Sequence, residues 1–231
     1  SGDITVGGFV ESAQLESGGD ITISGGIIGK KQEVEGASVS SILMSVSIVA
    51  KNKVFAKYCQ YADISCKNLR IENQLMHSII NVKESLWVGS ENKANGKLIA
   101  GYIRAGTSVH AGTVGATAGS VTIINFEQKL KLLDKKMQAI EARVAAESQK
   151  TDELKTANNK LKKLPKDKVT PEMKNKVMST YKFHANRMGA ALIEKDALEN
   201  EIQQYMSSVF IHASEKMYHG VKLIVGEFHD R

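Results

Sequence analysis

The stretch Ile48-Val49-Ala50-Lys51-Asn52-Lys53-Val54-Phe55-Ala56 decides the fold of this chain, because its pattern returns along much of the sequence. Two inward positions, Ile48 and Ala50, precede a short turn, and two more, Val54 and Ala56, follow it. The same template fits Leu15, Ser17, Ile21 and Ile23, then Ile64, Cys66, Leu69 and Ile71, then Ile80, Val82, Leu86 and Val88, and finally Ile103, Ala105, Val109 and Ala111. Ile48, Ile64 and Ile80 follow one another at a constant step, and an insertion around residues 91–97 lengthens the step to Ile103.

Period-two alternation inside a constant repeat predicts a parallel β-solenoid, in which each repeat is one coil and inward side chains stack on their equivalents. An antiparallel sandwich also alternates, but its strands would not recur at a constant step. A left-handed hexapeptide helix needs an aliphatic residue about every six positions, which this sequence lacks. We therefore predict a right-handed parallel β-helix over residues 1–125, with its register undefined between Gly25 and Ser45.

The turns of the predicted coils are rich in glycine and asparagine, as in Gly18-Gly19-Asp20, Lys51-Asn52-Lys53 and Gly106-Thr107-Ser108. Gly and Asn tolerate positive φ, so we expect left-handed backbone at these corners. Asp3 and Asp20 occupy equivalent corners, where a carboxylate after glycine indicates a turn role rather than acid–base chemistry.

Residues 126–209 carry two heptad stretches on either side of Pro165 and Pro171, the chain's two prolines. The first seam reads Phe126, Leu130, Leu133, Met137, Ile140, Val144, Leu154 and Leu161; the second reads Val177, Tyr181, His184, Met188, Ala191, Lys195, Leu198, Ile202, Tyr205 and Val209. Steps alternating between four and three keep each row on one helix face, so we predict an antiparallel coiled-coil hairpin. Glu147, Thr151 and Asn158 also occupy seam positions, and predict weaker packing there.

Strand-like runs return after the hairpin, at residues 210–213 and 220–228. We expect residues 210–231 to complete or cap the solenoid, which makes the hairpin an insertion. The chain starts inside a strand motif without an initiator methionine, and this predicts that it derives from a longer protein.

Composition and motifs give little sign of chemistry. No apolar run approaches the roughly 20 residues of a membrane span, and Cys59 and Cys66 are expected to be reduced and buried. Gly25 to Lys31 fails the spacing of a phosphate loop. His184 lies on the second seam, where a packed imidazole is expected, and His212 and His219 lack partners at metal-ligand spacing. We predict no catalytic residue, cofactor site or metal site.

The formal net charge of +6 is unevenly distributed along the chain. Seven lysines crowd the end of the predicted hairpin: Lys160, Lys162, Lys163, Lys166, Lys168, Lys174 and Lys176. They form either a solvated turn or a binding site for an acidic protein surface, with peripheral contact to anionic lipid as a weaker reading. Nucleic acid is disfavoured, because no aromatic residues are interleaved for base stacking.

Several short motifs, in this order and with a helical hairpin before the last of them, carry a family resemblance. They are Gly19-Asp20-Ile21-Thr22-Ile23, Gly26-Ile27-Ile28-Gly29-Lys30, Ala50-Lys51-Asn52-Lys53-Val54, Ala62-Asp63-Ile64 and Tyr218-His219-Gly220-Val221-Lys222-Leu223. The chain resembles the C-terminal portion of the bacterial flagellar assembly protein A family over nearly its whole length. The resemblance implies a right-handed β-helix without known catalysis and a separate N-terminal domain. It also implies a role in flagellar assembly or polar placement, a link to sugar-phosphotransferase signalling, and a cytoplasmic location.

The sequence leaves three candidate functions open. The first is a non-enzymatic scaffold that binds partners in bacterial motility, either a sugar-phosphotransferase component or a flagellar placement factor. The second is a self-assembling cytoskeletal solenoid. The third is a carbohydrate-active β-helix enzyme, which would need acidic and basic residues clustered on one strand face.

Overall fold

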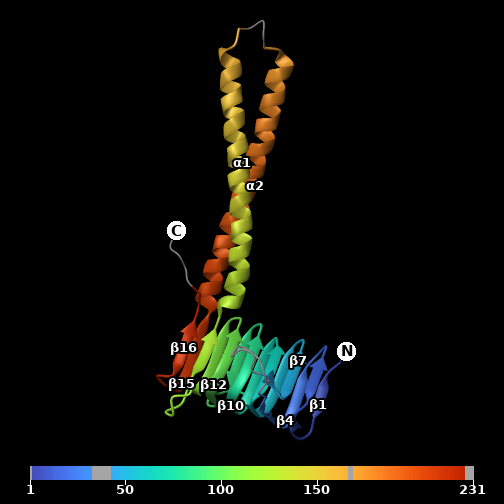
Figure 1. Cartoon of the computed structure of the whole chain (residues 1–231), viewed down its shortest axis with the longest axis vertical. Coiled ribbons are helices and arrows are strands. Elements are labelled where there is room, and N and C mark those ends of the chain that lie inside the picture. Colours follow the sequence, from blue (N-terminus) through green and yellow to red (C-terminus); the bar gives the residue numbers. More distant parts are fainter. Residues whose placement is uncertain (1, 33–42, 166–168, 227–231) are drawn as a thin grey trace. The chain divides into compact units, whose positions relative to one another are not determined.

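The computed structural model describes residues 2–32, 43–165 and 169–226. The chain divides into two compact units, one formed by Ser1–Leu130 with Ser207–Arg231 and the other by Lys131–Met206. The first unit contains the strands, which stack in parallel as successive coils of a solenoid (Figure 1). The second contains most of two long helices.

Each complete coil of the first unit runs along a first, a second and a third face. The first face holds β1 (Ile4–Val6), β11 (Ser85–Val88) and the starts of β4 (Ile21–Ile28), β8 (Lys53–Gln60), β10 (Asn68–Val82), β13 (Ser108–Val114) and β15 (Phe210–Met217). The second face holds β2 (Val10–Glu11), the start of β12 (Lys97–Ala105), the middle of β10 and the ends of β4, β8, β13 and β15. The third face holds β3 (Gln14–Ser17), β7 (Val46–Ala50), β9 (Ala62–Cys66), β14 (Thr122–Asn125), β16 (Val221–Ile224) and the ends of β10 and β12.

The core is a set of stacked aliphatic ladders. Ile80 pairs in register with Ile64 on one side and with Ile103 on the other, which confirms the predicted ladder. These three side chains are at most 1% exposed. The template missed the second face, whose inward ladder includes Val10, Ile27, Cys59, Leu75, Leu98 and Val114. Each short strand there contributes one inward residue of this ladder, so alternation gave no signal.

The expected left-handed backbone at the glycine- and asparagine-rich corners was wrong. Among the described non-glycine residues, positive φ occurs instead at Ser12, Tyr61, His77 and Ala100, all between the second and third faces. Glycine serves a different purpose at the predicted corners: a Cβ on Gly106 would collide with the carbonyl oxygen of Lys83 in the preceding coil.

Polar side chains at the corners between the third and first faces link successive coils. Asp3 Oδ1 accepts a hydrogen bond from the amide of Asp20 at 2.8 Å, and Asp20 Oδ1 accepts one from the amide of Lys53 at 3.1 Å. Asn68 repeats the arrangement with the amide of Ser85 at 3.1 Å. These carboxylates therefore act in the turns, where they satisfy backbone donors.

Two pairs of strands complete the first unit. β5 (Lys31–Gln32) and β6 (Leu43–Met44) pair antiparallel between β4 and β7, where the sequence template lost its register. After the helices, β15 pairs with β13 and β16 pairs with β14, both in parallel. The chain thus leaves the solenoid after β14 and resumes it at β15.

The helices are α1 (Glu127–Lys163) and α2 (Pro171–Ser208). Proline is favoured in the first turn of a helix, and the Thr170 hydroxyl before Pro171 accepts a hydrogen bond from the amide of Met173 at 3.3 Å. Ion pairs join Glu141 to Lys195 and Arg143 to Glu194, at 3.4 and 2.9 Å. Arg143 lies after Glu141 in α1, whereas its partner Glu194 lies before Lys195 in α2. The two helices therefore run antiparallel.

Burial on the helices follows the alternating steps of four and three. The buried side chains of the second unit are Leu133, Met137, Glu147 and Thr151 on α1 and Ala191, Leu198 and Tyr205 on α2. All of them occupy seam positions. The handedness of the solenoid and the supercoiling of the helix pair stay predictions.

Candidate interaction sites

The predicted binding lysines occupy both helix ends that flank the turn of the hairpin. Lys160, Lys162 and Lys163 lie in the last turn of α1, and Lys174 and Lys176 lie near the start of α2. All five are exposed, whereas Lys166 and Lys168 lie outside the described residues. We call the five described residues the turn lysines.

Helix electrostatics explains only part of this set. Cations near a helix C-terminus are stabilised by the helix dipole, so Lys160, Lys162 and Lys163 are favourably placed. Lys174 and Lys176 lie near an N-terminus, where the dipole disfavours positive charge. Helix stability therefore does not account for lysines on both sides of the turn.

Several cations further along the hairpin are paired, unlike the turn lysines. Arg143 contacts Glu194, Arg187 contacts Glu147 at 3.2 Å, and Lys195 contacts Glu141. Within the described ranges, none of the turn lysines forms an ion pair. Their positive field is consequently less offset by neighbouring carboxylates than that of these three paired cations.

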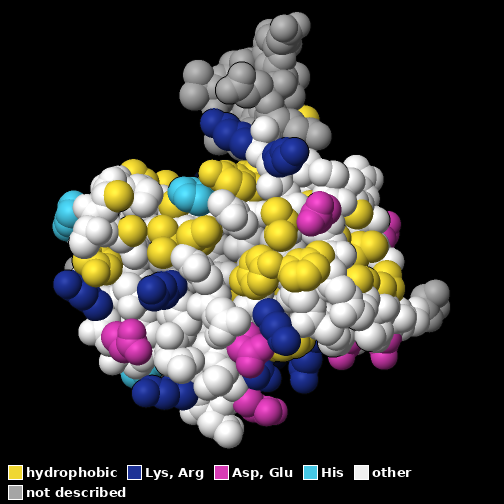
Figure 2. Space-filling model, turned by 90° about the horizontal axis from the view of Figure 1, so that it is seen from below, with side chains coloured by type: hydrophobic (Ala, Val, Ile, Leu, Met, Phe, Trp, Pro, Cys, Tyr) yellow, Lys and Arg dark blue, Asp and Glu magenta, His cyan; other side chains and the backbone are white. Residues whose placement is uncertain are grey.

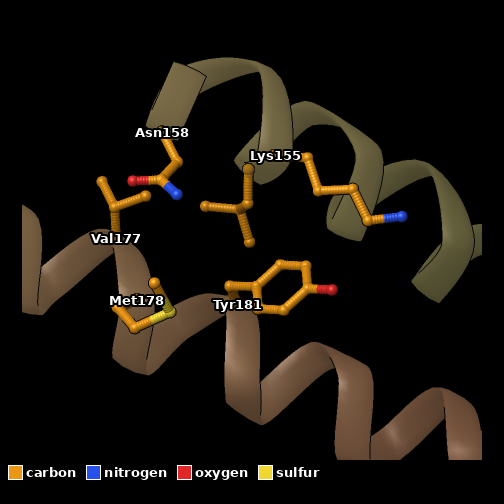
Figure 3. Close-up of a pocket in the computed structure, with 6 residues that line it drawn as sticks. Lys155, Asn158, Val177, Met178 and Tyr181 are labelled. Carbon is orange, nitrogen blue, oxygen red and sulfur yellow. The ribbon is translucent and has the colours of Figure 1, made fainter. Parts of the chain in front are cut away.

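A cavity of about 220 Å³ lies between the helices, close to the turn lysines in sequence. Leu154, Lys155 and Asn158 of α1 line it together with Val177, Met178 and Tyr181 of α2. Figure 3 shows Met178 and Tyr181 extending from one helix toward the α1 residues. Of these lining residues, Asn158 is the one whose seam position in the sequence indicates weak packing, because an amide fills the space between helices poorly. The lining suits an apolar side chain of a partner and supplies no reactive group.

The polar centre of the seam consists of Glu147, His184 and Arg187. His184 Nδ1 lies 2.5 Å from Glu147 Oε2, and Arg187 Nε lies 3.2 Å from Oε1. Since an ionised carboxylate can only accept, His184 Nδ1 donates this hydrogen bond. The His184 hydrogen bond is the main cause that lowers the pKa of Glu147, and the Arg187 charge adds to it. The seam histidine is packed as predicted, but the sequence did not reveal its carboxylate partner.

A row of outward side chains on the first face was missed. Phe55, Arg70, Trp87 and His110 each lie between two inward residues of the template, in adjacent coils. The signal was present, because these four residues occupy the same template position. The template itself predicts only the inward residues.

The remaining sequence candidates do not come together. Gly25-Gly26-Ile27-Ile28 lies within β4, and the described ranges hold no group of three or more His, Cys, Asp or Glu residues suited to a metal ion. Cys59 and Cys66 are both buried as free thiols, and burial raises the pKa of each to about 12. No helix in the described ranges is long and apolar enough to cross a membrane.

Apolar side chains are also visible on the outside of the solenoid. Figure 2 shows them gathered between charged residues on one side of the molecule. Scattered surface apolar groups are ordinary in soluble proteins, so this view alone identifies no binding site.

Comparison with known proteins places the chain in a family. Searches of curated proteins and of solved structures find no match. The family model described as "Flagellar Assembly Protein A beta solenoid domain" matches residues 1–231, essentially the whole chain, and the stacked parallel coils agree with that description. The chain therefore belongs to the flagellar assembly protein A family, and this membership indicates a role in flagellar assembly.

Proposed function

We propose that this chain is a non-enzymatic scaffold in flagellar assembly, and that the turn lysines bind an acidic surface on a partner protein. In this proposal a right-handed solenoid forms the rigid body, and a coiled-coil hairpin carries the binding residues. The observation that carries the proposal is that five exposed lysines, none of which forms an ion pair within the described ranges, gather at the two helix ends that flank the turn.

Exposed ion pairs contribute little to folding, so stability gives no reason to gather lysines at one end. Long-range attraction does give a reason, because clustered charge speeds encounter with a partner of opposite sign. The nearby cavity lined by Met178 and Tyr181 would then accept an apolar side chain once the partner has arrived.

The partner classes that fit are a sugar-phosphotransferase component and a flagellar placement factor, met in the cytoplasm and at the cell pole. Anionic lipid is a secondary ligand with the same charge requirement. Lysines without interleaved aromatic residues offer no stacking platform for single-stranded nucleic acid.

The test compares two charge reversals on the same helices. One variant changes Lys162, Lys163, Lys174 and Lys176 to Glu, and the matched control changes the exposed lysines Lys135, Lys136, Lys150 and Lys182 to Glu. Purified sugar-phosphotransferase proteins and vesicles containing anionic lipid serve as probes in surface plasmon resonance over a salt series. We expect the turn variant to associate with a protein probe at least tenfold more slowly than the control at low salt, and the difference to shrink as salt rises.

Equal association rates for the two variants across the salt series would contradict the proposal. Loss of vesicle binding alone would assign the turn lysines to a membrane surface instead. Far-UV circular dichroism of both variants checks that the helices remain folded.

A further inference from the structure

The outward row on the first face forms a continuous column across successive coils of the solenoid. Register pairs Arg70 with Phe55 and with Trp87, then Trp87 with His110, and His110 with His212. The residues on either side of each in the strand point into the core, as Leu86 and Val88 do around Trp87. We call Phe55, Arg70, Trp87, His110 and His212 the outer column.

The aromatic rings of the outer column pack against one another. The Trp87 and His110 ring centroids are 4.9 Å apart, and His110 meets the edge-on ring of Phe210 at 5.1 Å. The ring centroids of His212 and His110 are 6.1 Å apart. Neighbouring rings in the column therefore cover part of each other's surfaces.

Polar groups of the rings are largely engaged within the protein. Trp87 Nε1 donates to the carbonyl oxygen of Ser90 at 2.8 Å, and His110 Nε2 lies 3.2 Å from the Ser108 hydroxyl. Burial is the main cause that lowers the pKa of His110, and the nearby His212 adds to it, which favours the neutral form of the ring. This part of the column is apolar and rigidly held.

Arg70 supplies the charge of the column. Its guanidinium lies 5.2 Å from the centre of the Phe55 ring, and its Nε is buried without a hydrogen-bond partner. No carboxylate in the described ranges pairs with it. A buried donor without an acceptor costs free energy, and such groups call for an explanation in a native structure.

Arg104 on the third face provides the contrast. It also packs on an aromatic ring, 4.7 Å from the centre of Tyr102. Burial raises the pKa of the Asp63 carboxyl, and the charge of the nearby Arg104 opposes this rise. Among the described residues, the arginine on the third face therefore has a carboxylate nearby, whereas the arginine on the first face pairs with none.

We infer that the outer column binds an acidic segment of a partner protein, with a carboxylate beside Arg70 and an apolar side chain against the edges of Trp87 and His110. Tryptophan and arginine are enriched among residues that dominate protein–protein binding, particularly where they are held rigidly and shielded from water. An arginine–carboxylate contact adds a charge-assisted hydrogen bond. Sugar binding fits less well, because it needs open ring faces and free polar side chains. This surface is separate from the turn lysines.

Trp87 allows a direct test, since it is the chain's one tryptophan and its fluorescence reports on this surface. A displayed library of random peptides is selected on the full chain that carries the turn-lysine reversal, so that acidic peptides cannot bind there. We expect the selected peptides to combine Asp or Glu with a neighbouring apolar residue and to shift the Trp87 emission. Arg70→Glu should weaken their binding at least tenfold, while the matched Arg104→Glu should leave it unchanged.

Peptides that leave Trp87 emission unaltered, or that lose equal affinity with both arginine variants, would overturn the inference. Neutral oligosaccharides provide a second way to overturn it. If they shift the Trp87 emission of Arg70→Glu but not that of His212→Ala, the column binds a sugar. Thermal melts verify that Arg70→Glu folds. If Arg70→Glu does not fold, Arg70→Gln is used in its place, and the same loss of acidic-peptide binding is expected.

Discussion

The solenoid and the hairpin each bury a row of side chains on every element, but they fill that row differently. Inward residues of the solenoid such as Ile21, Ile64 and Ile80 are aliphatic and fully buried. The hairpin seam instead includes buried polar residues, Glu147 and Thr151, as well as buried apolar ones such as Leu133. The solenoid is held by repeated apolar ladders, and the hairpin partly by pairs between polar side chains.

Polar groups show the same division. In the solenoid, Asp3 and Asp20 accept hydrogen bonds from backbone amides of the next coil, so they reinforce a fixed repeat. In the hairpin, Glu147 depends on His184 and Arg187 of the opposite helix. A rigid body suits the constant spacing that the outer column requires. A seam with titratable contacts is more sensitive to its surroundings.

The largest expected effect breaks a ladder of the solenoid. Ile80→Ala should lower the free energy of unfolding by about 2–5 kcal/mol, because it removes a fully buried side chain and leaves a cavity. The matched control is Ile79→Ala in the same strand, whose side chain is only half-buried on the outer side of the sheet. Denaturant unfolding measures both. Equal losses for the two variants would show that the inward ladder does not dominate solenoid stability.

A smaller and more local effect is expected in the hairpin. Leu198 is 6% exposed on α2, and Leu198→Ala should cost about 2 kcal/mol, at the low end for buried leucines because the seam is narrow. Leu192→Ala on the same helix is the control, since Leu192 is 40% exposed. Hydrogen exchange should quicken across residues 131–206 and stay unchanged in the strands. Faster exchange in both units would mean that they unfold together.

The sequence predicted those parts of the fold where one physical requirement repeats. Ile48, Ile64 and Ile80 must stack, so their constant step predicts the ladder without knowledge of the turns. Seam burial on the helices follows the four-three spacing for the same reason. Tyr61 and His77 adopt positive φ although neither is glycine or asparagine. Their rings stack with centroids 5.1 Å apart, a tertiary contact that local propensity does not reveal.

The candidate sites were predicted less completely. The turn lysines were evident because charge clustering is a property of the sequence alone. The partners of Arg70 and His184 depend on which residues meet across coils or helices, and a shift of one residue would change them. The outer column was within reach, since Phe55, Arg70, Trp87 and His110 share a template position. Its geometry required the register that pairs β8, β10, β11 and β13.

The smallest expected effect is a dependence of hairpin stability on pH through Glu147. Its folded-state pKa is lowered below the ordinary value of 4.5, first by the His184 hydrogen bond and then by the Arg187 charge. A carboxyl with a lowered folded-state pKa contributes stability above its unfolded pKa, and this contribution is lost as pH falls through 4.5 toward the folded-state value. Glu147→Gln should therefore flatten hairpin stability across this acid range, measured by hydrogen exchange of residues 131–206. Glu153→Gln, an exposed change on the same helix, should retain the wild-type profile. If Glu147→Gln and the wild type lose stability in parallel on acidification, the Glu147–His184 pair does not stabilise the seam. The hairpin would then resemble the solenoid in depending on apolar burial alone.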